Sequence, residues 1–357
     1  MSMLAPKPRP GIMDISAYVG GASKLAGFDR VMKLSSNEGA LGPSPKAVAA
    51  YQAVANDMHR YPDGHAGRLR DALAERWGLE ADRIVCGNGS DDLLQLLCRA
   101  YSGPGDEVLY VRHGFAIYHI SAQSCGATPV AADDVDLTAS VDNLLAKVTP
   151  NTKIVFIANP NNPTGTYISA DEVRRLHAGL PKDVLLVIDA AYAEYVGRND
   201  YEDGCSLVKQ FANVVVTRTF SKIFGMGGMR LGWAYCPPAI ADVLNRIRGP
   251  FNVALPTLAA GEAALADVEF TELARRHNDY WRDWFAAEVR RLGLEVVDGG
   301  VCNFILVKCN ADAFLKSKGI IVRPLAGYGL PDYLRITIGR EDEMRAVAAA
   351  LKDYVGG

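Results

Sequence analysis

A lysine and an arginine stand close together in one glycine-rich stretch, and both could do chemistry. Lys222 follows Ser221, and Arg230 comes shortly after them. A lysine amine is a poor nucleophile at neutral pH because its unperturbed pKa is about 10.4. Burial or a neighbouring cation lowers that pKa, so that the neutral amine can attack a carbonyl carbon. The stretch therefore indicates a reactive amine, and a surface lysine beside an ordinary ion pair is the plain alternative.

The surroundings of this lysine suit a phosphate. The guanidinium of Arg230 is a permanent cation whose planar fork matches phosphate oxygens, and Ser221 adds a hydroxyl donor. Three glycines between positions 225 and 228 let the backbone bend and approach a ligand closely. A strand-like run at 213–218 leads into the stretch. We therefore expect the lysine at the carboxyl end of a sheet strand, where open α/β sheets bind ligands.

Two other predicted strands also end in polar residues. The run at 153–157 leads into Asn-Pro-Asn-Asn-Pro-Thr-Gly at 159–165, a rigid turn with more asparagine than folding alone needs. The apolar run at 184–188 stops at Asp189. A carboxylate in that setting is costly to bury unpaired, so the pattern predicts a cationic partner for it.

A glycine-rich turn at 87–92 joins a short strand predicted at 84–86 to a helix predicted at 93–101. Free N–H groups and the helix dipole at a helix N-terminus bind phosphate. We expect Ser90 and Asp91 to form a third wall of the phosphate site beside Ser221 and Arg230. A simple helix cap is the alternative for both residues.

These motifs resemble a known enzyme family. The pattern Ser-Lys-x-x-Gly-x-x-Gly-x-Arg at 221–230 resembles the lysine motif of fold-type I, pyridoxal-phosphate-dependent aminotransferases. The wording Thr-Phe-Ser-Lys-Ile-Phe at 219–224 resembles the histidinol-phosphate aminotransferases among them, and the turn at 159–165 resembles their Asn-Pro-x-Asn-Pro-Thr-Gly. The resemblance covers nearly the whole chain.

The resemblance implies a role for each motif at the cofactor, pyridoxal 5'-phosphate. Lys222 would hold it as a Schiff base and then shuttle a proton, and Asp189 would keep the pyridine nitrogen protonated. Phe115 would stack on the ring, although His113-Gly114 replaces the family's usual lead-in and a core phenylalanine is the alternative. The cofactor-binding residues implied in this way are Tyr61, Ser90, Asp91, Phe115, Asn162, Asp189, Tyr192, Ser221, Lys222 and Arg230.

Most of the expected substrate-binding residues lie near the two ends of the chain. Arg335 interrupts an apolar strand, where a guanidinium favours an oxyanion and a structural ion pair is the alternative. By resemblance, it grips the substrate's carboxylate or phosphate. The substrate-binding residues implied in this way are Tyr18, Asn37, Asn162, Arg323 and Arg335. Two further departures from the family pattern are Gly39-Ala40, where Asn-Pro is usual, and Ala190 in place of glutamate.

The implied reaction is a ping-pong transfer of the amino group of histidinol phosphate to 2-oxoglutarate, in histidine biosynthesis. The products would be imidazole acetol phosphate and glutamate. An aromatic amino-acid or prephenate aminotransferase is the alternative, and a phospho-amino-acid decarboxylase or a regulatory protein of the same fold also stays open. Tyr61 would reach the partner's active site, which implies a homodimer.

Length and composition set the expected architecture. A chain of 357 residues predicts two domains, and alternating strands and helices predict an α/β, doubly wound, mostly parallel sheet. We expect an arm at 1–43, a large domain at 44–250 and a smaller α+β domain at 251–357. The net charge of −3 offers no basic surface for nucleic acid. Seven scattered cysteines and the lack of a long apolar run predict a cytoplasmic protein with no metal site and no membrane contact.

Overall fold

A seven-stranded sheet forms the centre of the larger part of the molecule. The computed structural model describes residues 6–17 and 20–357, so the expectation for Tyr18 lies outside the described residues. The strand order is β2-β8-β7-β6-β5-β3-β4. The strands are β2 (Ile84–Gly87), β3 (Glu107–Val111), β4 (Thr128–Ala132), β5 (Thr152–Ala158), β6 (Leu185–Asp189), β7 (Val214–Thr219) and β8 (Gly232–Tyr235).

Only β8 runs against its neighbours in this sheet, being antiparallel to both β2 and β7. The pairs from β7 through to β4 are all parallel. The predicted mostly parallel α/β class is therefore confirmed.

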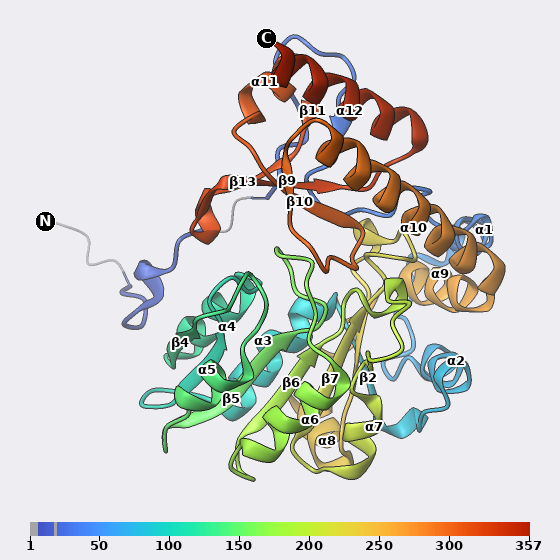
Figure 1. Cartoon of the computed structure of the whole chain (residues 1–357). Coiled ribbons are helices and arrows are strands. Elements are labelled where there is room, and N and C mark those ends of the chain that lie inside the picture. Colours follow the sequence, from blue (N-terminus) through green and yellow to red (C-terminus); the bar gives the residue numbers. More distant parts are fainter. Residues whose placement is uncertain (1–5, 18–19) are drawn as a thin grey trace, which may run out of the picture.

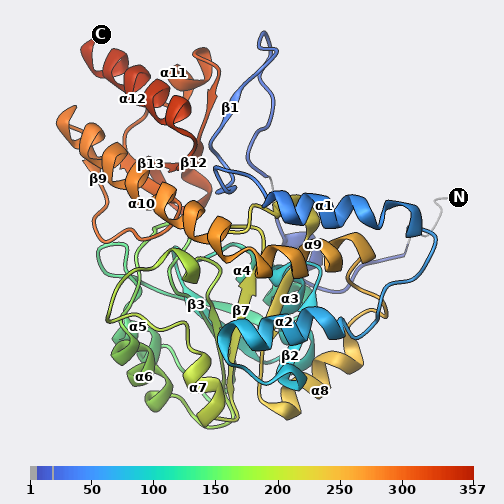
Figure 2. The same cartoon turned by 90° about the vertical axis from the view of Figure 1, so that its right-hand side faces the viewer.

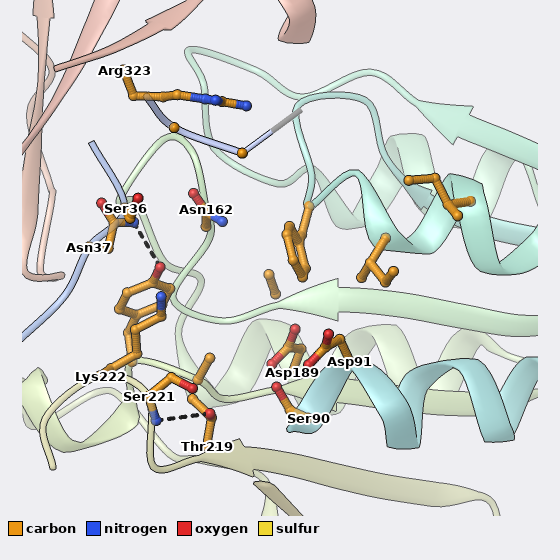
Figure 3. A pocket seen from close by; sticks show the side chains of 18 of the residues that line it. Ser36, Asn37, Ser90, Asp91, Asn162, Asp189, Thr219, Ser221, Lys222 and Arg323 are labelled. Atoms are coloured by element: carbon orange, nitrogen blue, oxygen red, sulfur yellow. Dashed lines mark hydrogen bonds between the residues drawn. The ribbon is translucent and has the colours of Figure 1, made fainter. Parts of the chain in front are cut away.

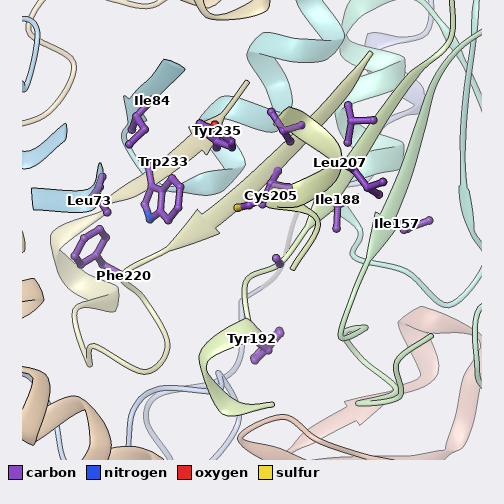
Figure 4. Close-up of a cluster of buried hydrophobic side chains, with 14 of the residues drawn as sticks. Leu73, Ile84, Ile157, Ile188, Tyr192, Cys205, Leu207, Phe220, Trp233 and Tyr235 are labelled. Atoms are coloured by element: carbon purple, nitrogen blue, oxygen red, sulfur yellow. The ribbon is translucent and has the colours of Figure 1, made fainter. Parts of the chain in front are cut away.

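Helices cover both faces of the sheet because its central strands are apolar on both sides. Val155 and Ile157 of β5 face one buried cluster, and Ile154 and Phe156 face another. Figure 4 shows part of the first cluster, with Trp233 and Phe220 in its core. Its helices are α1 (Pro45–Ala53), α2 (Gly67–Trp77), α5 (Val141–Ala146), α6 (Ala170–Gly179), α7 (Cys205–Gln210) and α9 (Leu255–Ala266). The second cluster is covered by α3 (Ser90–Tyr101), α4 (Ile117–Cys125) and α8 (Pro238–Ile247).

The C-terminal part is built on a second, antiparallel sheet with the order β12-β13-β10-β9. Its strands are β9 (Glu295–Val296), β10 (Phe304–Lys308), β12 (Arg323–Leu325) and β13 (Leu330–Thr337), and its helices are α10 (Val268–Arg291), α11 (Asp312–Ser317) and α12 (Glu341–Gly356). Figures 1 and 2 show this part stacked on one end of the large sheet.

The N-terminal segment is tied to this C-terminal part. β1 (Met32–Lys33) pairs in parallel with β11 (Ile320–Ile321). Helix α9 follows residue 250 but buries its side chains in the core of the large sheet. The domain division at residue 250 stays a prediction, and the chain leaves the large sheet through α10.

Short elements complete the structure. Ser44 caps α1, because its side chain accepts the N–H of Lys46 and Pro45 stands in the first turn. All seven cysteines are free. Among residues 6–17 and 20–357, no helix is both long and apolar enough to cross a bilayer. The 3-10 helices are η1 (Ile12–Asp14), η2 (Ala55–Asp57), η3 (Ala81–Arg83), η4 (Ala193–Tyr195), η5 (Gly227–Met229) and η6 (Ala326–Tyr328).

Candidate active site

A cavity of about 630 Å³ lies where the large sheet, the N-terminal segment and the C-terminal part meet. Figure 3 shows Lys222, Asp189 and Asn162 around it. Most of the residues predicted from the sequence line this one cavity. They are Asn37, Ser90, Asp91, Phe115, Asn162, Asp189, Tyr192, Ser221, Lys222, Arg230, Arg323 and Arg335.

Tyr61 is the described site residue that does not line the cavity. Its side chain is 82% exposed, and its ring stacks on Phe251 with the centroids 4.7 Å apart. An exposed pair of aromatic rings is a feature of protein interfaces. Its position is therefore compatible with a role outside its own chain's cavity.

Strand ends explain why distant residues converge here. β6 ends at Asp189, β7 ends at Thr219 just before Lys222, and β5 ends shortly before Asn162. These three strands are parallel neighbours. Their carboxyl ends therefore open at the same edge of the sheet, as the sequence predicts.

The amine of Lys222 lies in surroundings that favour its neutral form. The pKa of Lys222 is lowered to about 8, mainly by burial and next by the positive charge of Arg335, while Asp189 opposes both effects. Arg230 also lowers this pKa, but less than Arg335 does. The Nζ atom lies 5.5 Å from the centre of the Tyr192 ring. A neutral amine is thus accessible near physiological pH.

The loop that carries Lys222 packs tightly on the N-terminal segment. Gly225 has a φ of 64°, and a Cβ there would collide with the backbone of Gly42. A Cβ at Gly39 would lie 2.9 Å from the carbonyl oxygen of Lys222. The unusual glycine at position 39 therefore allows this segment to lie directly against the lysine loop.

Arg230 stands at the N-terminus of α3. Its Nη1 donates to Ser221 Oγ at 3.4 Å, and its Nη2 pairs with Asp91 Oδ1 at 2.7 Å. A Cβ at Gly89 would collide with the guanidinium, and one at Gly232 would collide with the backbone nitrogen of Ser90. Glycine at these positions leaves a cradle with a cation, a hydroxyl and helix N–H groups, which suits a phosphate.

Helix α3 begins earlier than the sequence predicts. It starts at Ser90, and its N-cap is Gly89, which has a φ of 96°. The alternative that Ser90 or Asp91 simply caps this helix is therefore wrong, because both lie in its first turn. Asp91 acts instead on the position of Arg230, through their ion pair.

Asp189 is 4% exposed, and its carboxylate is held by three donors. Tyr118 donates to Oδ2 at 2.9 Å and Thr217 to Oδ1 at 3.4 Å, and the N–H of Ala191 adds a third bond. Burial raises the pKa of Asp189 to about 6, against these hydrogen bonds and the charge of Lys222. The carboxylate is thus still mainly ionised at neutral pH and suits a protonated nitrogen in a ring.

Asn37 holds the phenol of Tyr192. Its Nδ2 donates to Tyr192 Oη at 2.9 Å (Figure 3), and its Oδ1 accepts from Thr337 Oγ1 at 3.1 Å. The backbone of Asn37 has a φ of 56°, a region that few residues other than glycine adopt. Asn303 donates to the carbonyl oxygen of Asn37 at 3.0 Å. Through Asn37, the C-terminal part thereby positions the side chain of Tyr192, which follows strand β6 of the large sheet.

Two arginines face the cavity from the C-terminal sheet. Arg323 in β12 lies directly opposite Arg335 in β13 in the strand register, and both line the cavity. Arg335 donates to Asn162 Oδ1 and to the carbonyl oxygen of Ser35. Like charges placed opposite each other repel, so this pair favours an anion between them.

Sequence reasoning misses Tyr118, Thr217, Thr337 and Asn303. Tyr118 stands in an apolar helix start, and Thr217 stands inside a strand. Thr337 and Asn303 meet Asn37 only through contacts across 300 and 266 residues of chain, for which a local pattern gives no signal. A position at the end of a strand is the signal that found Asn162, Asp189 and Lys222.

Comparisons with known proteins agree with this geometry. The model of the family "Aminotransferase class I and II" matches residues 29–351. The chain is 63% identical to the histidinol-phosphate aminotransferase of Paramagnetospirillum magneticum, over 99% of this chain and 100% of that protein. It is 58% identical to that of Rhodospirillum centenum, with the same coverage.

Solved structures show the same fold. The histidinol-phosphate aminotransferase of Sinorhizobium meliloti, in complex with pyridoxal-5'-phosphate, has a TM-score of 0.90 and 28% identity, and the match covers 99% of each chain. The aspartate aminotransferase of Thermus thermophilus with maleate has a TM-score of 0.81 and 21% identity, covering 91% of each chain, and shows the fold alone. The chain therefore belongs to the class I and II aminotransferases and, within them, to the histidinol-phosphate aminotransferase family.

Proposed function

We propose that this chain transfers the amino group of histidinol phosphate to 2-oxoglutarate, with pyridoxal 5'-phosphate as cofactor, in histidine biosynthesis. One observation carries the proposal. A chain 63% identical to a histidinol-phosphate aminotransferase gathers an amine of lowered pKa, a buried carboxylate and three arginines around one cavity. Its relatives do not favour the aromatic amino-acid or prephenate alternative.

The residues of the cavity fit this cofactor. When bound, pyridoxal 5'-phosphate supplies an aldehyde that takes up an amine and a ring that accepts electrons from the substrate. Lys222 would tether it through Nζ, and Asp189 would hold a proton on the ring nitrogen. Arg230, Ser221 and the first turn of α3 would hold the phosphate, and Asn162 with Tyr192 would donate to the ring oxygen. Phe115 would cover one face of the ring.

Lys222 also moves the proton in this proposal. A base works best when its pKa lies near the working pH, because both protonation states are then accessible. The pKa of about 8 at Lys222 meets this condition. Once the substrate's amine stands in its place, the Nζ atom would take a proton from the substrate's alpha carbon as base and, as acid, deliver it to the carbon of the cofactor's former aldehyde group.

Arg323 and Arg335 would bind the anionic groups of the substrate, because they lie opposite each other and line the cavity. The test is a panel of donors with 2-oxoglutarate as acceptor: histidinol phosphate, histidinol and phenylalanine. We expect kcat/KM for histidinol phosphate to exceed that for histidinol by about 100-fold, because the phosphate makes charge-assisted bonds. A preference for phenylalanine over histidinol phosphate would overturn the proposal.

Cofactor uptake should depend on pH through Lys222. Only the neutral amine attacks an aldehyde, and its fraction falls about tenfold per pH unit below the pKa. Because the pKa of Lys222 is lowered to about 8, uptake by the cofactor-free chain should rise with pH and level off above about pH 8. Stopped-flow absorbance after mixing with pyridoxal 5'-phosphate measures this rate. N-acetyl-lysine methyl amide is the control, with a midpoint near about 10.4. A protein midpoint as high as that of the control would contradict the assignment.

We also propose a homodimer in which Tyr61 of one chain reaches the cavity of the other. The exposed stack of Tyr61 on Phe251, outside its own cavity, supports this arrangement. In such a dimer, a Lys222→Ala chain and a Tyr61→Ala chain complete one intact site when they pair.

We propose that the protein works in the cytoplasm, which its free, mostly buried cysteines support.

Co-expression of the two variants should therefore restore activity. Random pairing makes about half of the dimers mixed, and each mixed dimer has one intact site of its two. The expected activity is therefore about a quarter of that of the wild type, well above the mean activity of the two variants expressed separately. Tyr280→Ala is the matched control, because Tyr280 is also an exposed tyrosine, at 62%, and should keep its activity alone. Co-expressed chains no more active than that mean would speak against a shared site, as would a monomer in sedimentation.

A further inference from the structure

A tyrosine outside the cavity holds the carboxylate that faces it. Tyr118 in α4 is 1% exposed, and its O–H donates to Asp189 Oδ2 at 2.9 Å. Asp189 lines the cavity, whereas Tyr118 does not. The phenol therefore lies behind the carboxylate and leaves its other side open to a ligand.

The ring of Tyr118 is fixed from two sides. It stacks on Phe156 with the centroids 4.8 Å apart and an angle of 7° between the planes. Phe115 meets it edge-on, at 6.0 Å and 84°. Aromatic contacts of this kind hold a ring in one orientation, so its O–H stays directed at Asp189. One short segment thus carries both this donor and Phe115, the residue expected to cover the cofactor's ring.

The electrostatics agree with this geometry. Burial raises the pKa of Asp189, and the hydrogen bond from Tyr118 is the largest of the effects that oppose it. The bond from Thr217 is longer, at 3.4 Å, and comes second. Burial also holds the pKa of Tyr118 well above its usual range, so the phenol keeps its proton and remains a donor. The other titratable groups that act on Asp189 are Lys222 and Tyr192.

We propose that Tyr118 is a positioning residue that keeps Asp189 ionised and directed into the cavity, so that the carboxylate can hold a proton on a bound nitrogen ring. The second half of this inference rests on the proposed function, because that ring is the cofactor's pyridine. The first half concerns the protein alone and can be tested without cofactor.

The first experiment measures unfolding by denaturant in cofactor-free Tyr118→Phe at about pH 5 and about pH 8. Below the pKa of Asp189 the carboxyl is protonated and gains little from the phenol, whereas above it the ion loses its best donor. The destabilisation relative to wild type should therefore be larger at pH 8 than at pH 5. Equal destabilisation at both values would mean that Tyr118 only fills space, and would overturn the inference.

Two further variants make the comparison specific. Tyr110→Phe removes a buried phenol that bonds His119 Nδ1 at 3.0 Å and not Asp189, so its destabilisation should follow a different pH course. Thr217→Val removes the weaker donor and should give a smaller pH-dependent effect than Tyr118→Phe. The part of the destabilisation that appears as Asp189 ionises should be larger in Tyr118→Phe than in Thr217→Val. A larger such part in Thr217→Val would contradict the proposal.

The second experiment uses the cofactor. Loss of a hydrogen bond to a buried charge should weaken the affinity of Tyr118→Phe for pyridoxal 5'-phosphate by about 10-fold and lower kcat by about 10- to 100-fold. It should also shift the pH midpoint of the bound cofactor's visible absorbance, which Tyr110→Phe should leave in place. An unchanged affinity and midpoint in Tyr118→Phe would refute the cofactor half. A wild-type chain that takes up no cofactor would instead refute the proposed function, and the unfolding experiment would still decide the role of Tyr118.

Discussion

Replacing Lys222 with alanine is expected to abolish amino-group transfer, with a loss in kcat of at least about 10⁴-fold. The amine of Lys222 is the lysine nitrogen that lines the cavity, and its pKa is lowered to about 8. The proposed function assigns it both the tether and the proton transfer, and alanine can do neither. The measurement is single-turnover conversion of histidinol phosphate by the variant, with excess pyridoxal 5'-phosphate.

The variant should still bind the cofactor without a covalent bond. Arg230, Ser221 and Asp189 remain in place, because they are held by partners other than Lys222. Lys182→Ala is the matched control, because Lys182 lies exposed between α6 and β6 and should keep full activity. Near-normal transfer by Lys222→Ala would refute the assignment of the site.

Replacing Asp189 with asparagine should give the next largest loss, roughly 1,000-fold in kcat. The side chain keeps its shape but loses the negative charge, so it no longer stabilises a proton on the cofactor's ring nitrogen. Tyr118 donates to Oδ2 and Thr217 to Oδ1, so the single oxygen of the amide can keep one of these two bonds, and a partial loss of stability should accompany the loss of activity. Steady-state kinetics and the denaturant midpoint, measured on the same sample, separate the loss of activity from a loss of stability.

The size of this effect distinguishes a chemical role from a general charge effect. Asp200→Asn is the control, because Asp200 is an exposed carboxylate bonded to Tyr167 Oη at 2.9 Å and lies outside the cavity. It should change kcat by less than about twofold. If Asp189→Asn stayed within about tenfold of wild type, the cofactor's ring nitrogen would not depend on this carboxylate.

Residues at strand ends can be predicted from the sequence, and the reason is topological. Asn162, Asp189 and Lys222 each follow an apolar strand, and parallel strands must open at one edge of their sheet. Once the strands are recognised, the convergence of these three side chains needs no further information. The mostly parallel sheet, with helices on both faces, follows from the same alternation.

The contacts that orient these residues cannot be predicted in this way. Asn37 and Tyr192 are 155 positions apart, and Arg335 and Asn162 are 173 apart. Each pair crosses between the two parts of the molecule, whose relative placement no local period encodes. Tyr118 gives an even weaker signal, because a tyrosine at the start of an apolar helix is typical of a packed core.

The structure also explains the roles of single glycines that the sequence pattern leaves unexplained. Gly39 departs from the family's sequence pattern, and in the structure it lies against the backbone of Lys222. The early start of α3 at Ser90 depends on Gly89, whose φ of 96° suits glycine and ends the preceding turn.

The most direct measurement of the central claim is the site of attachment of the cofactor. The wild-type chain is incubated with pyridoxal 5'-phosphate, reduced with borohydride to fix any carbon–nitrogen double bond, digested and sequenced by mass spectrometry. We predict one stoichiometric pyridoxyl group, on the peptide that contains Lys222. A modified lysine elsewhere, or an intact Lys222 under saturating cofactor, would contradict the account.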